Sequence, residues 1–314
     1  MQLDRSSGWL FAATLSVVLA CGGEDTPPPA GGGPANMVAS CEADRRLGGF
    51  EVQYDADTRS VSGHIAERPA PTAPETLVKQ SGDCRMLRRT NPFCDPPCGS
   101  GTICVTGGTC AAEPKNLNLG TVTITGLKKA VRMDPRPPSN EYFDSDLPEV
   151  LYDPGNEIRL EASGSGDVRG FALRSTGIPP LTVSTTDWSL GQGKGLPLSW
   201  SAANGGSTRV LVRVSVDQHG SSPVALTCDL PDNGKADLAA SLVDELLGYG
   251  VSGYPSALIT RRAVVATDVV NGCADLQILS VSNHTLKVAG HTPCKRTSDC
   301  PMGKTCDVAK ESCR

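Results

Sequence analysis

Apolar and polar residues alternate along much of the chain between residues 114 and 291. In Thr208–Val216 four valines occupy every second position, so they share one face of a strand whose other face is mostly polar. Glu157–Ala162 and Thr121–Thr125 alternate in the same way. Short strands of this kind, separated by turns rich in Gly, Pro, Asn and Asp, predict a β-sandwich. Further strands are expected at Arg169–Arg174, Leu196–Trp200, Val224–Cys228, Leu258–Ala266, Leu276–Val281 and Thr285–Val288.

One segment of this region follows a helical period instead. In Asp237–Leu247 leucines recur at every fourth position, Asp237 is expected as the N-cap, and Gly248 follows as a stop signal. A single helix is therefore predicted, covering one open end of the sandwich. The expected fold class is mainly β: a β-sandwich with one short helix, flanked by small disulfide-rich modules.

The first 21 residues have the pattern of an export signal. Trp9–Ala20 is a 12-residue apolar run, shorter than the roughly 20 residues that a helix needs to cross a bilayer. It is therefore predicted to be the apolar part of a signal peptide. The Val-Leu-Ala sequence directly before Cys21 resembles the lipobox of bacterial lipoproteins. That resemblance implies cleavage before Cys21 and attachment of acyl chains such as palmitate, whereas an ordinary secretory signal cleaved near Ala20 is the alternative.

The segment after Cys21 is expected to be a flexible tether. It contains Pro-Pro-Pro and Gly-Gly-Gly tracts and almost no apolar side chains, so it cannot form a packed element. The chain is thus expected to divide into a lipoprotein signal peptide (1–20), the lipidated Cys21 with its tether (21–40), a small disulfide-bracketed β segment (41–93), a cysteine-rich module (94–113), the β-sandwich domain (114–291) and a C-terminal cysteine-rich module (292–314).

Thirteen cysteines indicate an oxidising compartment. Without Cys21 an even number remains, which allows complete pairing. We expect each cysteine to pair within its own sequence group. The expected pairs are Cys41 with Cys84, Cys228 with Cys273, Cys94 with Cys104, Cys98 with Cys110, Cys294 with Cys306, and Cys300 with Cys313.

The two short modules, 94–113 and 292–314, resemble the small cysteine-rich repeats of extracellular proteins, including those appended to secreted myxobacterial proteins. Segments this short cannot bury a sufficient core, so cross-links must stabilise them. Crossed pairing ties each module into one unit, and uncrossed pairing remains open. A four-cysteine zinc site is the competing interpretation. It is disfavoured because the modules lack paired Cys-x-x-Cys knuckles and histidine, and no metal is expected.

Composition excludes several functions. The 314 residues include 34 glycines and 24 prolines but only 5 Phe, 5 Tyr and 3 Trp, which is typical of a turn-rich β protein with a modest core. The net charge of −5 is spread without long runs, so nucleic-acid binding is not expected. The motifs of zinc peptidases, serine-hydrolase elbows and nucleotide-binding phosphate loops are absent from the sequence.

Few single residues stand out as catalytic candidates, and no catalytic residue is predicted. The histidines are His64, His219, His284 and His291. His219 lies near Asp217 and is a candidate general base, although a turn residue is the favoured interpretation. Trp188 and Trp200 are expected to fill the core rather than to stack on a sugar ring.

One loop is rich in carboxylates, which are the ligands that extracellular calcium modules use. Its spacing is not that of an EF-hand, so a solvated acidic loop is the favoured interpretation. The residues concerned are Asp144, Asp146, Glu149, Asp153 and Glu157.

The overall layout resembles a group of uncharacterised lipoproteins from myxobacteria. Within the β domain that resemblance rests on Trp200, the His219-Gly220 turn and the segment Cys228–Gly234. It implies no known activity.

These features predict a non-catalytic, lipid-anchored protein of the outer membrane or cell surface, on its periplasmic or extracellular face, with a binding or envelope-structural role. The expected partners are the membrane and an envelope or extracellular protein or polysaccharide, and no cofactor is expected. Two alternatives remain open. One is an extracytoplasmic hydrolase acting on polysaccharide or peptide, which a cleft with two carboxyl groups would support. The other is a weak calcium-dependent adhesin.

Overall fold

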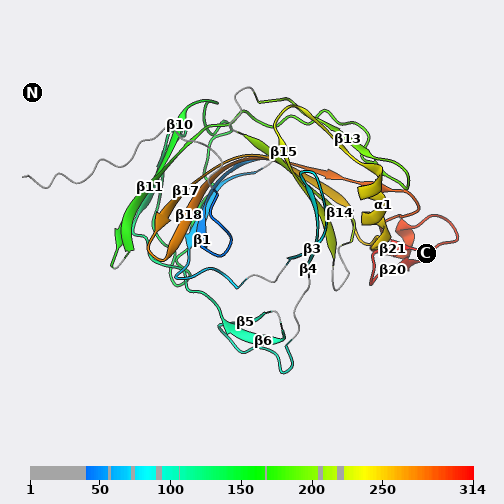
Figure 1. Cartoon of the computed structure of the whole chain (residues 1–314), viewed down its shortest axis with the longest axis horizontal. Helices are drawn as coiled ribbons and strands as arrows, with labels where there is room; N and C mark the ends of the chain where they lie inside the picture. The colour runs from blue at the N-terminus through cyan, green and yellow to red at the C-terminus, as the bar shows by residue number, and fades with distance from the viewer. Residues whose placement is uncertain are drawn as a thin grey trace, which may run out of the picture. The chain divides into compact units, whose positions relative to one another are not determined.

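The computed structural model describes residues 40–55, 58–71, 75–89, 94–105, 107–166, 168–203, 208–217 and 223–314, all of which belong to one compact unit. The fold is mainly β, with sandwich-like packing of sheets and one α-helix, as the alternation predicted (Figure 1).

A nine-stranded sheet organises the fold, in the order β3-β4-β15-β14-β17-β18-β1-β2-β9. β17 (Ser256–Val269) and β18 (Gly272–Thr285) form a long central hairpin, and β1 (Arg46–Tyr54) pairs in parallel with β18. The other strands are β2 (Arg59–Ile65), β3 (Glu75–Ser81), β4 (Cys84–Arg89), β9 (Tyr142–Asp144), β14 (Arg209–Ser215) and β15 (Val224–Pro231).

The described residues of 41–93 do not form the separate β segment that the sequence predicted. β1 and β2 join the nine-stranded sheet on one side of the central hairpin, and β3 and β4 join it on the other. Strands that neighbour one another in a sheet need not be neighbours in the sequence. The sequence therefore predicted β structure in this segment without revealing the partners of its strands.

Two separate layers cover one face of this sheet, which we call the outer face (Figure 1). One layer is a four-stranded sheet in the order β11-β10-β7-β8. The other consists of α1 (Ala240–Gly248) and two short ribbons, β12–β19 and β13–β16. The strands of both layers are β7 (Val122–Thr125), β8 (Val131–Met133), β10 (Glu157–Ser165), β11 (Val168–Thr176), β12 (Ser189–Leu190), β13 (Leu196–Ser199), β16 (Lys235–Leu238) and β19 (Lys287–Val288).

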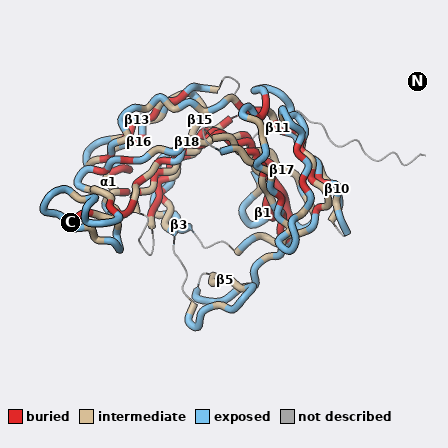
Figure 2. The backbone as a smooth tube through the Cα atoms, turned by 180° about the vertical axis from the view of Figure 1, so that it is seen from behind, coloured by how far each residue is buried: buried red, intermediate tan, exposed pale blue. Residues whose placement is uncertain are grey.

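Each layer closes its own hydrophobic core. Under the four-stranded sheet, Phe50 and Ile278 of the large sheet pack with Leu160 of β10, and all three are fully buried. Under the helix, the predicted valine row of β14 is buried with Leu246 of α1. Buried positions, red in Figure 2, run along β1, β17 and β18. One sheet thus carries two cores.

The helix is confirmed, but it begins later than predicted. α1 starts after Ala239, and the stretch that contains Asp237 and Leu238 forms β16 instead. Asp237 is therefore not the N-cap. Pairing of Leu238 with Leu196 in the β13–β16 ribbon competes with the first helical turn, an interaction that the helical period does not reveal.

Both long-range disulfides differ from the expected pairs. Cys41 bonds to Cys273, not Cys84, and Cys84 bonds to Cys228. The sheet order explains the exchange. Cys84 and Cys228 face each other on the adjacent strands β4 and β15, with Cα atoms 3.9 Å apart, and Cys273 opens β18 beside the start of β1.

The two small modules contain the four crossed bonds that the sequence predicted: Cys94–Cys104, Cys98–Cys110, Cys294–Cys306 and Cys300–Cys313. Each module also forms a short antiparallel ribbon. These are β5 (Thr102–Val105) with β6 (Thr109–Ala112), and β20 (Cys306–Asp307) with β21 (Ser312–Cys313), the latter preceded by a 3-10 turn, η1 (Thr297–Asp299).

Candidate functional site

A fully buried arginine lies on the outer face between the two cores. Along β17, Arg261 stands two residues from Ile259 of one core and two residues from Ala263 of the other. Its side chain is 0% exposed and forms an ion pair with Asp232, whose side chain is 3% exposed. A charge in this position is tolerated only when its hydrogen bonds are made inside the protein.

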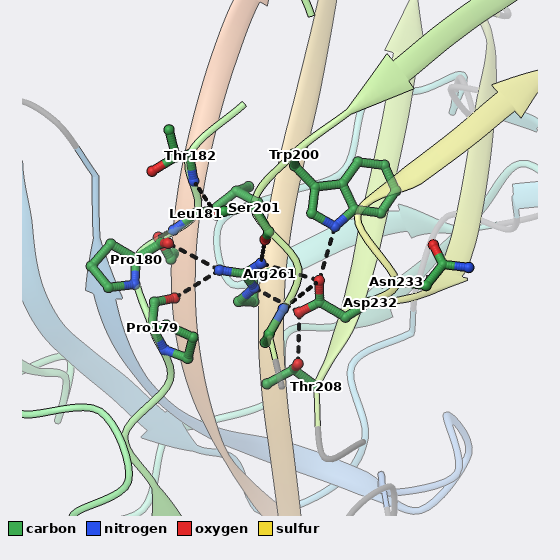
Figure 3. Close-up of polar contacts among 12 residues, drawn as sticks. Pro179, Pro180, Leu181, Thr182, Trp200, Ser201, Thr208, Asp232, Asn233 and Arg261 are labelled. Atoms are coloured by element: carbon green, nitrogen blue, oxygen red, sulfur yellow. Dashed lines mark hydrogen bonds and ion pairs between the residues drawn. The ribbon is translucent and has the colours of Figure 1, made fainter. Parts of the chain in front are cut away.

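All five N–H groups of Arg261 have acceptors (Figure 3). Nε and Nη2 donate to the Asp232 carboxylate at 2.6 and 3.1 Å, and Nη1 donates to the carbonyl oxygens of Pro179 and Pro180 at 3.1 and 2.9 Å. Nη2 also donates to the carbonyl of Ser201. With every donor used, Arg261 holds together three loops of the covering layers and has none left for a ligand.

The other half of this pair is equally well satisfied. Asp232 accepts hydrogen bonds from Trp200 Nε1 at 2.8 Å and from Thr208 Oγ1 at 2.7 Å. Burial by itself raises the pKa of Asp232, but the hydrogen bonds from Arg261, Thr208 and Trp200 outweigh burial and hold that pKa below its usual value. Trp200 and the segment Cys228–Gly234, which contains Asp232, were noted separately in the sequence and thus meet in a structural network.

A second arginine–aspartate pair lies on the opposite, inner face of the large sheet. Arg46 Nε and Nη2 donate to the two carboxylate oxygens of Asp275 at 2.8 and 3.0 Å. The Asp275 side chain is 3% exposed, but that of Arg46 is 40% exposed. The hydrogen bonds to Asp275 raise the pKa of Arg46. Among the described residues, nothing accepts a hydrogen bond from Nη1 of Arg46.

Two glycines in β1 make this arrangement possible. A Cβ atom on Gly49 would lie 1.9 Å from Oδ1 of Asp275, so only glycine lets that carboxylate lie against the strand. Gly48 has a φ of 137° at a register shift in the pairing of β1 with β18, next to Arg46. The irregular start of β1 therefore positions the guanidinium beside the sheet surface.

Arg46 lines a groove of about 460 Å³ on the inner face of the large sheet. Two rows of residues across the strands form it: Gly49 pairs with His64, and Glu51 pairs with Ser62. Glu141 and the aromatic residues of β9 complete its wall. The groove is thus lined by the guanidinium of Arg46, the carboxylates of Glu51 and Glu141 and the imidazole of His64. Its volume falls within the range of small-molecule sites, about 300–1,000 Å³.

An exposed aromatic ring stands at the rim of the groove. Phe143 belongs to β9, the edge strand, and is 41% exposed. Arg136 fixes its position in two ways, since Nη2 donates to the Phe143 carbonyl at 2.8 Å and the guanidinium carbon lies 5.1 Å from the ring centroid. Neither the groove nor Arg46 was singled out from the sequence, because its parts lie far apart in the chain.

The acidic loop does not gather its carboxylates. Asp146 pairs with Lys129 and Asp153 with Lys128, while Oδ1 of Asp144 accepts the backbone N–H of Asp146 at 2.8 Å. The hydrogen bond from Lys129 lowers the pKa of Asp146. Within the part of the chain that the structure describes, the only groups of three or more metal-ligating side chains are cysteines of the two modules, whose sulfur atoms are in disulfides.

Histidine and tryptophan contacts in the core under α1 are packing contacts. Trp200 is 5% exposed in that core, and Trp188 packs against it, as predicted. Trp188 stacks on His284 with ring centroids 3.9 Å apart, and Nε2 of His284 lies 2.8 Å from Oγ of Ser282. Burial lowers the pKa of His284. Cys21 and His219, two residues of interest in the sequence, lie outside the described residues.

No protein-family model and no curated protein matches the chain. Among solved structures, the crystal structure of the FN1–FN3 domains of chicken CNTN1 matches over 69% of this chain and 69% of that chain, at 11% sequence identity and a TM-score of 0.18. Across the described ranges, no helix is long and apolar enough to span a membrane.

Proposed function

We propose that this chain is a lipid-anchored protein of the outer membrane or cell surface that acts by non-catalytic binding through its inner-face groove. The observation that carries the binding role is the Arg46–Asp275 pair. Its carboxylate is buried and its guanidinium faces the groove with N–H groups that no described residue accepts. A preorganised donor beside Glu51 and His64 is the kind of polar group that orients a bound molecule.

The anchor part of the proposal rests on the lipobox-like sequence before Cys21. Because acylation requires the thiol, Cys21→Ala is expected to abolish incorporation of radiolabelled palmitate and processing of the signal peptide. Ser40→Ala, at the end of the tether, is the matched control and is expected to label normally. Palmitate labelling that persists in Cys21→Ala contradicts the anchor. Protease treatment of intact cells then tells the extracellular face from the periplasmic face.

A hydrolase is the second candidate function, because Glu51 and Glu141 both line the groove. Glycoside hydrolases use two carboxyl groups that flank the bond they cleave. Incubation of the purified protein with chromogenic glycosides distinguishes the two functions. Turnover that disappears in Glu51→Gln but persists in Glu161→Gln, a strand glutamate outside the groove, would replace the non-catalytic proposal.

A further inference from the structure

We infer that the ligand of the inner-face groove is a neutral saccharide. This inference rests on the proposed binding function and specifies its ligand class. It starts from the formal charge of the groove. Arg46 and Arg136 contribute two positive charges, whereas Glu51, Glu141 and the Asp275 that pairs with Arg46 contribute three negative charges. A site for a phosphate or a carboxylate needs an excess of positive charge, which this groove lacks. A metal-cation site needs several ligating groups close together, and among the described residues the carboxylates and the imidazole of the groove do not form such a group, so an uncharged polar ligand is favoured.

The polar groups of the groove match the chemistry of sugar hydroxyls. Each hydroxyl both donates and accepts hydrogen bonds. The Nη1 donors of Arg46 supply the hydrogen bonds that hydroxyl oxygens accept, and the carboxylate of Glu51 accepts those that hydroxyls donate. Glu51 lies on the same cross-strand row as Ser62, and Ser62 pairs with Phe143. Donors, acceptors and an aromatic ring therefore follow one another across three strands.

Phe143 supplies the apolar contact that a sugar ring requires. One side of a pyranose presents C–H groups, which pack against the face of an aromatic side chain. The Phe143 ring is 41% exposed, and its position is fixed by the backbone hydrogen bond and the guanidinium of Arg136. Phe143 therefore presents an apolar ring, held in place by Arg136, at the rim of the polar groove.

A second hollow in the described residues has a different character. It measures about 140 Å³ and is lined mainly by apolar side chains, among them Ile65, Leu119 and Phe171. A polar ligand would lose its hydration there without forming replacement hydrogen bonds. The inner-face groove, at about 460 Å³, has both the larger space and the polar groups.

The test is calorimetric titration of the full-length protein in detergent micelles. The probes are the neutral disaccharides maltose, cellobiose and N,N′-diacetylchitobiose, with inorganic phosphate and glycylglycine as the charged and zwitterionic comparisons. Wild-type protein is expected to bind at least one disaccharide, while phosphate and glycylglycine give no heat of binding. Phe143→Ala and Glu51→Gln are each expected to weaken that binding about tenfold or more, the effect of losing roughly 1.4 kcal/mol.

Two control variants test whether the loss of binding is specific to residues of the groove. Tyr249→Ala removes an aromatic ring of similar exposure outside the groove, and Glu161→Gln removes a strand carboxylate there. Both are expected to bind like the wild type. Binding by none of the disaccharides overturns the inference, as does disaccharide binding that Phe143→Ala and Glu51→Gln leave unchanged.

Other outcomes separate this inference from the proposed function. Glycylglycine binding that Glu51→Gln abolishes would leave a binding groove but refute the saccharide. Cleavage of a bound disaccharide would support the ligand class and refute the non-catalytic role. Loss of palmitate labelling in Cys21→Ala is a separate measurement and does not depend on either result.

Discussion

The Arg261–Asp232 and Arg46–Asp275 pairs have the same chemistry but opposite surroundings. Both aspartate side chains are 3% exposed, whereas Arg261 is 0% exposed and Arg46 is 40% exposed. All five N–H groups of Arg261 are used inside the protein. Two of those of Arg46 bind Asp275, and the others have no acceptor among the described residues, on a side chain that lines the groove. The number of unused donors, and not the ion pair itself, separates a structural charge from one available to a ligand.

The place of each pair in the fold agrees with whether its arginine has unused donors. Arg261 lies between two hydrophobic cores, where an unpaired polar group cannot reach water. Arg46 lies beside a register shift at the start of β1, where the chain departs from regular pairing. Replacing one member of a pair is therefore expected to destabilise the protein by an amount that depends on the pair's surroundings.

The largest effect is expected for Arg261→Met. This change leaves Asp232 buried without its counter-ion and leaves three backbone carbonyls without a donor. The expected loss in the free energy of unfolding is about 3–5 kcal/mol, measured by urea denaturation of the purified protein. The double variant Arg261→Met/Asp232→Asn removes both charges and is expected to recover part of the loss. A single variant as stable as the wild type would refute the structural role of the pair.

The dependence of stability on acid pH tests the contribution of Asp232, the other partner of the buried pair. Because the pKa of folded Asp232 is held below its usual 3.8, its ionised form stabilises the folded state above that pH, and this contribution is lost as the pH falls through the lower, folded pKa. Asp232→Asn is therefore expected to be less stable at neutral pH and to lose less of its remaining stability in acid. Melting temperatures measured between pH 7 and pH 2 check this. The exposed Asp237→Asn is the control and should follow the wild-type curve.

A smaller effect on folding is expected for Arg46→Gln. The glutamine can still donate one hydrogen bond to Asp275, and the site lies beside solvent, so the expected loss is about 1–3 kcal/mol. Urea denaturation provides the measurement. Arg45→Gln, which breaks an exposed pair with Asp268, should cost nothing measurable. If Arg46→Gln destabilises the protein as much as Arg261→Met, exposure does not distinguish the two pairs.

Strand positions could be predicted from the sequence because alternation is a local property. The valine row of β14 is buried as expected, and the predicted strand Leu258–Ala266 lies within β17. That strand also held an overlooked signal. Ile259, Arg261 and Ala263 share one face of the strand. A charged residue therefore lies between two apolar residues on the face that alternation predicts to be buried. A charge in that position requires a buried carboxylate from elsewhere in the chain, which the sequence analysis did not infer.

Pairing partners and the groove could not be predicted in the same way. Arg46 and Asp275 are 229 positions apart, and no local pattern records that β1 lies beside β18. The pairing of Cys84 with Cys228 depends on the equally remote contact of β4 with β15. Within each small module, by contrast, the partners lie only 10 to 13 residues apart. Compactness favoured the crossed bonds while uncrossed pairing stayed open, and the structure has the crossed bonds.

The Cys41–Cys273 bond has a mechanical consequence. Cys41 lies just before β1, and Cys273 lies at the start of β18, one of the two central strands. A force that pulls on the chain before Cys41 therefore passes through a covalent bond into β18 instead of peeling β1 from its neighbours one hydrogen bond at a time. With this bond intact, tension applied from the N-terminal side reaches the middle of the sheet, and the groove on β1 and β2 is shielded from it.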